Sequence, residues 1–99
     1  MRTIWKFPLA FGPVTQHEVP SGAVPITVGL DPAADRGLRP GQVPDPVIAV
    51  WFDCPDHEAP TEHRWFTIVG TGHPVPPGEV LGSVFDGPFV WHVVEVTND

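Results

Sequence analysis

Hydrophobic and polar residues alternate along this chain in short runs that end at glycine or proline. Near the start, Trp5, Phe7 and Leu9 alternate with Ile4 and Lys6. A period of two is typical of a β-strand with one buried face. The same pattern predicts six to seven short strands in all, within residues 3–9, 14–19, 23–30, 47–54, 61–69, 79–85 and 89–96.

The abundance of chain-breaking residues sets the fold class. The chain has 14 prolines and 10 glycines in 99 residues. Proline lacks the backbone N–H and clashes inside a helix, so no substantial helix is expected. Short strands separated by turns predict an all-β fold, a small antiparallel sandwich or barrel. Residues 47–54 are almost continuously apolar, which predicts a central strand.

A Pro- and Gly-rich segment, residues 31–46, interrupts the pattern of strands. It contains little that could pack into a core, and we expect a long surface loop. It also contains Arg36 and Arg39, two of the four arginines. The sequence as a whole predicts a single β domain over residues 1–99, because 99 residues is near the usual size of one domain.

The stretch from Arg64 to Pro77 is the candidate site. Its first part reads as a strand, with Arg64, Phe66 and Ile68 on one face and Trp65 on the other. Its second part is the turn Gly70-Thr71-Gly72-His73-Pro74. Two glycines let backbone N–H groups approach a ligand closely, and His73 adds a ring that can donate or stack. A turn that merely ends the strand is the alternative.

The charge balance excludes several classes of partner. The formal net charge is −7, with one lysine and four scattered arginines. Binding to the phosphate backbone of nucleic acids needs clustered cations, so general nucleic-acid binding is not expected, and neither is binding to anionic membranes. A small anionic ligand, held by backbone amides and one or two cations, stays compatible.

Cysteine usage and hydropathy indicate where the protein works. The single cysteine, Cys54, has no partner for an internal disulfide, which favours an intracellular location. No segment approaches the roughly 20 apolar residues that span a bilayer, and no apolar region of signal-peptide length follows the N-terminus. We expect a cytoplasmic protein.

Metal and catalytic chemistry have one candidate motif. Cys54-x-x-His57 has the spacing of half a zinc site, but no second close pair follows it. Neither serine, Ser21 or Ser83, lies in a nucleophile elbow. We therefore expect no catalytic residue, no metal, no cofactor and no enzymatic activity. A metal-dependent hydrolase built around Cys54 and His57 stays as an alternative.

Four tryptophans fall in four different predicted strands: Trp5, Trp51, Trp65 and Trp91. Most aromatic residues of this size lie in a core or an interface, and a platform for stacking a planar base is the sharper alternative. Strand edges rich in aromatic residues need cover to avoid aggregation. A second copy of the chain provides that cover most simply, so a homo-oligomer is expected.

Three blocks of the sequence carry a family resemblance. They are Thr3-Ile4-Trp5-Lys6-Phe7-Pro8-Leu9, then Asp53 with Glu58-Ala59-Pro60-Thr61-Glu62 continued by Arg64-x-Phe66-x-Ile68-Val69-Gly70-Thr71-Gly72-His73-Pro74, and Gly87-Pro88-Phe89-Val90-Trp91-His92-Val93. Together they resemble a family of small uncharacterised proteins encoded by tailed bacteriophages and prophages. The resemblance implies a phage accessory protein in the bacterial cytoplasm. The departure is the 31–46 loop, which looks longer here.

The resemblance and the missing catalytic set lead to one main functional hypothesis. It is a non-enzymatic, anti-defence protein that sequesters a small nucleotide-like signal, such as a cyclic oligonucleotide, at an oligomer interface. The expected ligand-binding residues are Arg64, Trp65, Gly70, Thr71, Gly72, His73, Lys6 and Trp5. An adaptor or inhibitor that binds a host protein through edge strands and the 31–46 loop is the alternative.

Overall fold

The structure is a computed structural model that describes residues 1–32, 40 and 47–97. Most of the predicted surface loop, residues 31–46, lies outside these residues. At its base, the backbone N–H of Asp31 donates to the carbonyl oxygen of Val47 at 2.7 Å. The two flanking strands are therefore tied together where the loop leaves them.

Seven strands make up the described chain, and each end lies within one residue of its prediction. They are β1 (Thr3–Leu9), β2 (Thr15–Pro20), β3 (Val24–Leu30), β4 (Ile48–Cys54), β5 (Thr61–Gly70), β6 (Gly78–Asp86) and β7 (Phe89–Val96). The described residues contain no α-helix, and so none that could cross a membrane. The predicted all-β class is confirmed.

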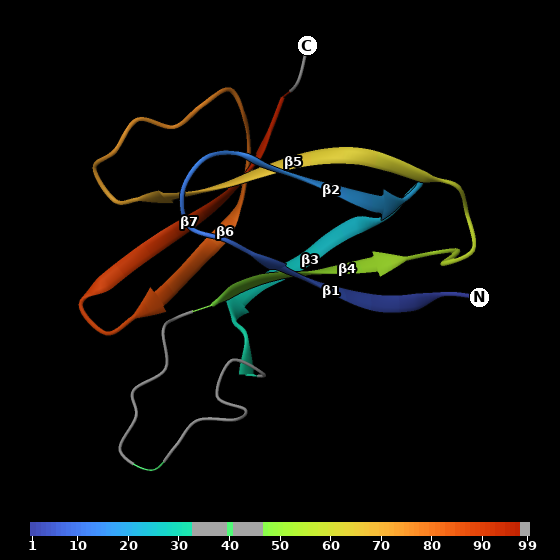
Figure 1. Cartoon of the computed structure of the whole chain (residues 1–99), viewed down its shortest axis with the longest axis horizontal. Coiled ribbons are helices and arrows are strands. Elements are labelled where there is room, and N and C mark those ends of the chain that lie inside the picture. The colour runs from blue at the N-terminus through green and yellow to red at the C-terminus, as the bar shows by residue number, and fades with distance from the viewer. Residues whose placement is uncertain (33–39, 41–46, 98–99) are drawn as a thin grey trace.

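The strands form two antiparallel sheets that pack as a small sandwich (Figure 1). One sheet has the order β1-β4-β3, and the other has the order β2-β5-β7-β6. The central place of β4 in its sheet agrees with its apolar run, in which five of seven residues are buried. The first and last strands lie in different layers of the sandwich.

The core lies between the two sheets. The rings of Phe52 on β4 and Phe66 on β5 meet edge to face with centroids 5.8 Å apart, and neither ring is more than 1% exposed. Along one side the sheets approach so closely that a Cβ at Gly82 would lie 2.7 Å from Val28 Cγ2. A side chain at this position would force Val28 or one of the two strands to shift.

The middle strand β5 is paired unequally along its length. β2 pairs with its first part, from Thr61 to Phe66. β7 pairs with its second part, from Trp65 to Gly70. From Thr67 to Gly70 the strand therefore has β7 on one edge and no strand on the other. Because the chain turns away after β1 and enters β2 only at Thr15, this edge is left open.

Candidate functional site

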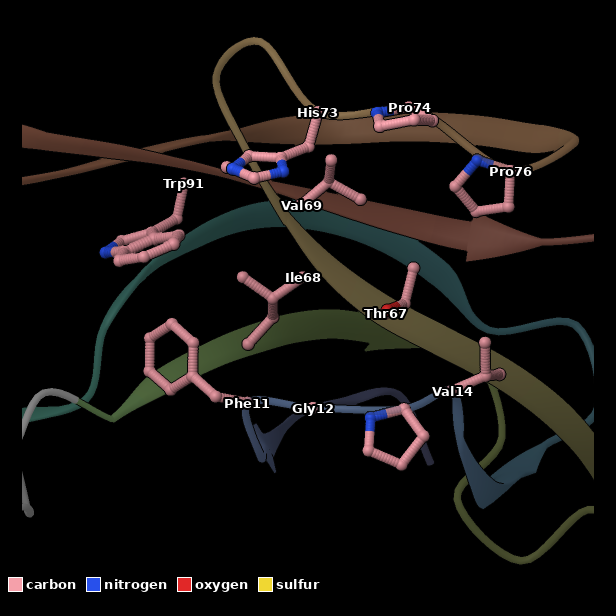
Figure 2. Close-up of a pocket in the computed structure, with 12 residues that line it drawn as sticks. Phe11, Gly12, Val14, Thr67, Ile68, Val69, His73, Pro74, Pro76 and Trp91 are labelled. Carbon is pink, nitrogen blue, oxygen red and sulfur yellow. The ribbon is translucent and has the colours of Figure 1, made fainter.

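A groove of about 500 Å³ lies along the open edge of β5 (Figure 2). The last residues of β5, from Thr67 to Gly70, form its floor. The connection between β1 and β2, residues 11–14, forms one wall, and His73, Pro74 and Pro76 form the other. Trp91 of β7 closes one end. Segments from three distant parts of the sequence thus meet at one place.

Two hydrogen bonds show which way the backbone of β5 points. The N–H of Ser21 donates to the carbonyl oxygen of Pro60 at 2.9 Å, and Thr15 Oγ1 donates to that of Phe66 at 3.5 Å. Both acceptors face β2. Since alternate residues of a strand point their backbone groups to the same edge, Ile68 also directs its N–H and C=O to this side. β2 does not extend far enough to pair with Ile68.

The open edge is short and has a defined end. The N–H of His73 donates to the carbonyl oxygen of Gly70 at 3.1 Å, which closes the turn after β5. Among the described residues, no backbone hydrogen bond joins Ile68 to the connection formed by residues 11–14. The N–H and C=O of Ile68 are therefore backbone groups that the groove offers to a ligand.

Aromatic rings surround the end of the groove near Trp91. The rings of Phe11 and Trp91 meet edge to face at 5.0 Å, and Phe89 stacks on Trp91 at 5.8 Å with an interplanar angle of 19°. A Cβ at Gly70 would lie 3.1 Å from His73 Cδ2 and 3.4 Å from Trp91 Cζ3. Gly70 therefore lets both rings approach the strand closely.

A row of hydrogen bonds holds the turn that carries His73. Thr71 Oγ1 lies 2.9 Å from His92 Nε2 and donates to the carbonyl oxygen of Val90 at 3.3 Å. On the other side of the imidazole, Ser83 Oγ lies 2.8 Å from His92 Nδ1. This row links the turn to β7 and β6. Gly72 within the turn has φ +90°, a conformation that favours glycine.

A second, smaller hollow of about 290 Å³ also borders His73. It shares Gly70, His73 and Trp91 with the first groove and adds Thr71 and Phe89. The Nε1 atom of Trp91 is buried and has no hydrogen-bond acceptor among the described residues. Buried polar atoms nearly always have a partner, so this donor marks the indole as unusual.

The comparisons with known proteins add a family. A model described as "Domain of unknown function (DUF7352)" matches residues 1–99. The chain belongs to this family. Searches of curated proteins and of solved structures each found no match. The description of the DUF7352 family states no activity, so the groove itself is the basis for inferring a function.

Four of the predicted ligand-binding residues of this DUF7352 chain lie at the groove. Gly70 and His73 border both hollows, and Thr71 borders the smaller one. Gly72 forms the turn between them. The structure thus brings together the part of the prediction that came from the Gly70–Pro74 turn.

Arg64 has a different environment. Its guanidinium makes a two-pronged ion pair with Glu95, with Nε and Nη2 at 2.6 and 2.7 Å from the carboxylate oxygens. Nη1 donates to the carbonyl oxygen of Ala23 at 2.7 Å, and the guanidinium carbon lies 4.9 Å from the ring centroid of Phe52. The hydrogen bond to Glu95 raises the pKa of Arg64. Arg64 therefore holds the sheets together and does not line the groove.

The three remaining predicted residues lie elsewhere on the sandwich. Trp65 is on the outer face of β5, with its ring centroid 6.4 Å from that of His63. Lys6 and Trp5 belong to β1, in the other sheet. Lys6 Nζ is 2.9 Å from Asp31 Oδ1. None of the three borders the groove, so the structure does not gather the eight residues into one site.

Sequence reasoning did not assign Phe11 or Trp91 to the groove. Trp91 was grouped with the other tryptophans, because its place beside Gly70 depends on the pairing of β5 with β7. Phe11 precedes the turn-forming pair Gly12-Pro13, so its place at the groove depends on how the connection between β1 and β2 packs.

The alternative metal site has no third ligand in the described part of the chain. No group of three or more His, Cys, Asp or Glu side chains there is arranged to hold a metal ion. Cys54 is fully buried, and burial raises the pKa of its thiol. His57 Nδ1 lies 3.0 Å from the carbonyl oxygen of Met1. These two residues are thus used in local packing and in a contact with the N-terminus.

Proposed function

We propose that this chain is a non-enzymatic binding protein whose groove along β5 holds an uncharged group with a flat ring. The observation that carries the proposal is the combination of ring walls and an open strand edge. Phe11, His73 and Trp91 border the groove, and Ile68 offers a backbone donor and acceptor at its floor. Aromatic side chains stack on many kinds of flat ring. Backbone N–H and C=O groups then select a ring whose polar edge is complementary to them.

The charge of the groove supports an uncharged ligand group. Among its described lining residues there is no Asp, Glu, Lys or Arg. The three cationic side chains of the described chain are each paired with a carboxylate: Arg2 with Asp53, Lys6 with Asp31, and Arg64 with Glu95. A phosphate in the groove would have no cation beside it, and burying an unpaired charge is costly.

A nucleotide-like ligand is the second candidate, and the aromatic rings favour it. Its base would occupy the groove near Trp91, and its phosphates would have to remain in solvent. Under this candidate, the protein would sequester a nucleotide-like defence signal of a phage's bacterial host. It predicts that a nucleoside and its cyclic dinucleotide bind with similar affinity, because the phosphates would contribute little.

Amide chemical-shift titration tests the proposal. We would titrate the protein with indole, adenosine and cyclic di-adenosine monophosphate. The expected result is a set of perturbations confined to Gly70, Ile68 and the indole N–H of Trp91. Phe11→Ala should weaken binding by about tenfold, since stacking on one ring is worth roughly 1–3 kcal/mol.

A matched control distinguishes binding in the groove from nonspecific binding to exposed aromatic residues. Trp65→Phe removes an indole from the outer face of β5 and should leave every affinity unchanged. If none of the three ring-bearing probes perturbs the groove of the folded protein, the proposed function is wrong. Equal losses in Phe11→Ala and Trp65→Phe would also contradict it.

A further inference from the structure

We infer that the natural occupant of the groove is an extended segment of a partner polypeptide that pairs with the open edge of β5. This inference rests on the proposed function and identifies what presents the ring. Strand addition to an exposed sheet edge supplies main-chain hydrogen bonds, while alternate side chains supply specificity. The groove of this chain provides both elements.

The backbone argument starts from Ile68. Its N–H and C=O point out of the sheet into the groove, because β5 alternates and β2 begins only at Thr15, opposite Phe66, and so does not reach Ile68. A ring with a donor beside an acceptor, such as adenine, can pair with both groups, but it does not continue along the strand. A single residue of an extended chain satisfies both, by exchanging two N–H···O bonds in the antiparallel manner. The open edge of β5 therefore matches an extended peptide better than an isolated ring compound.

The length of the edge limits the segment that pairs. The turn bond from His73 N–H to the carbonyl of Gly70 closes one end, and the chain entering β2 at Val14 and Thr15 closes the other. Three to four residues of a partner fit between these limits, at about 3.4 Å of rise per residue. The recognised element is thus a short extended motif within a longer chain.

The two sides of the groove define the side chains of that motif. In Figure 2, Ile68 points toward Phe11, while Val69 lies next to His73. A residue opposite Ile68 places its side chain on the same face, toward Phe11 and Trp91. Its two neighbours face the other side, toward His73 and the prolines after it. We therefore expect an aromatic residue at the centre, with an apolar residue on each side.

Charge complementarity indicates what lies beyond the motif. The groove lining in the described residues is uncharged, whereas the whole chain has a formal net charge of −7. The described cations already have carboxylate partners, so the surplus negative charge faces the solvent. A segment with basic residues flanking its apolar centre is attracted by this field, and its association slows as salt is added.

The test uses fluorescently labelled peptides with blocked ends and the sequence Lys-Lys-Val-X-Val-Lys-Lys, where X is Phe, Trp, Tyr or Leu. Fluorescence polarisation against the full chain should give the tightest binding for aromatic X. Two backbone variants of the Phe peptide carry one N-methyl group each. Methylation of the central residue removes the N–H that would pair with Ile68 and should weaken binding at least about tenfold, the loss of a hydrogen bond together with a steric clash.

Methylation of a neighbouring valine is the matched control. Its N–H points away from β5 in the paired strand, so affinity should stay within about twofold of the parent. On binding the parent peptide, the Ile68 amide should also become protected from hydrogen exchange. Raising the salt concentration should slow association without changing this pattern.

Each other result overturns the inference in a distinguishable way. Equal binding of both methylated peptides, or equal binding of phenylalanine amide alone, shows a ring site without strand pairing and leaves the proposed function standing. Binding by neither peptides nor ring-bearing probes removes both. Protection of the Ile68 amide in a dimer without peptide shows that a second copy of the chain is the occupant.

Discussion

The two halves of β5 come from one continuous strand but are satisfied in different ways. In the first half, β2 pairs along one edge, and Arg64 is fully occupied by Glu95, the carbonyl of Ala23 and the ring of Phe52. In the second half, the same edge is open, the lining is uncharged, and the strand runs into the turn that presents His73. One half closes the sandwich, and the other faces a groove.

The difference shows how a ligand role should be assigned on such a strand. A cation in an otherwise apolar stretch attracts attention as a ligand contact, yet here Glu95, the carbonyl oxygen of Ala23 and the ring of Phe52 already contact the guanidinium. The open backbone edge attracts no attention in the sequence, since every strand has the same N–H and C=O groups. It becomes visible only when the neighbouring strand is seen to end.

The largest expected effect comes from disrupting the first half of β5, where β2 pairs along the edge; we call this the closed half. Arg64→Ala leaves Glu95, 21% exposed, without its partner, and removes the donor to Ala23. Removing one member of a buried pair typically costs about 3–5 kcal/mol, so we expect a loss of about 3 kcal/mol in the free energy of unfolding. Urea denaturation measures it. The double variant Arg64→Ala with Glu95→Ala should recover part of the loss, and a loss below about 1 kcal/mol for the single variant would contradict this role.

A smaller effect on stability should follow from adding a methyl group at Gly70, where the second half of β5 meets the turn. Gly70→Ala places a Cβ against the rings of His73 and Trp91, at 3.1 and 3.4 Å. Overpacking typically costs about 1–3 kcal/mol, and we expect about 1 kcal/mol here because His73 is exposed and can shift. Ring-bearing probes should also lose affinity.

Gly29→Ala is the control for this substitution. Gly29 is also in a strand, but the nearest side-chain atom to its added Cβ, in Trp51, would lie at 3.7 Å, an ordinary contact. We expect a change within about 0.5 kcal/mol in urea denaturation and no change in probe affinity. Equal costs at the two glycines would show that the rings do not crowd Gly70.

The closed half should also determine the response to acid. His17 on β2 lies opposite Arg64, and its ring contacts Phe7 and Phe66, with Nε2 3.2 Å from Thr15 Oγ1. Burial lowers the pKa of His17 below the ordinary value of 6.5. The unfolded chain then takes up a proton first, so stability is retained above pH 6.5 and falls as the pH drops toward the lower folded pKa.

Unfolding midpoints in urea between pH 7.5 and 5 measure this slope. His17→Phe should reduce the slope, because a ring of similar shape remains but does not titrate. If His17→Phe keeps the wild-type slope, the acid response does not come from His17.

The smallest expected effect on stability is that of the groove residue itself. His73 is exposed and is held mainly through its backbone N–H, which alanine retains. His73→Ala should therefore change the free energy of unfolding by less than about 0.5 kcal/mol, while weakening the binding of ring-bearing probes. A loss above about 1 kcal/mol would assign His73 to structure and not to recognition.

The sequence allowed the strands to be predicted because their determinants are local. Alternation such as that of Trp5, Phe7 and Leu9, ended by turn residues, is visible within one segment. The turn from Gly70 to Pro74 stood out for the same reason. The order of strands and the pairing of Arg64 with Glu95 depend on register between distant segments, which local pattern does not encode. The groove escaped prediction because Phe11 and Trp91 reach it from other elements.

The sheet order has a consequence for how the chain folds as it is synthesised. Among the described strands β1 pairs only with β4, with Thr3 opposite Cys54, so β1 has no strand partner until β4 has been synthesised. β7, the last strand, joins β5 to β6. Such distant pairings make folding slow and leave apolar strands exposed until their partner strands have been synthesised. During that interval the nascent chain exposes the kind of apolar surface that leads to aggregation.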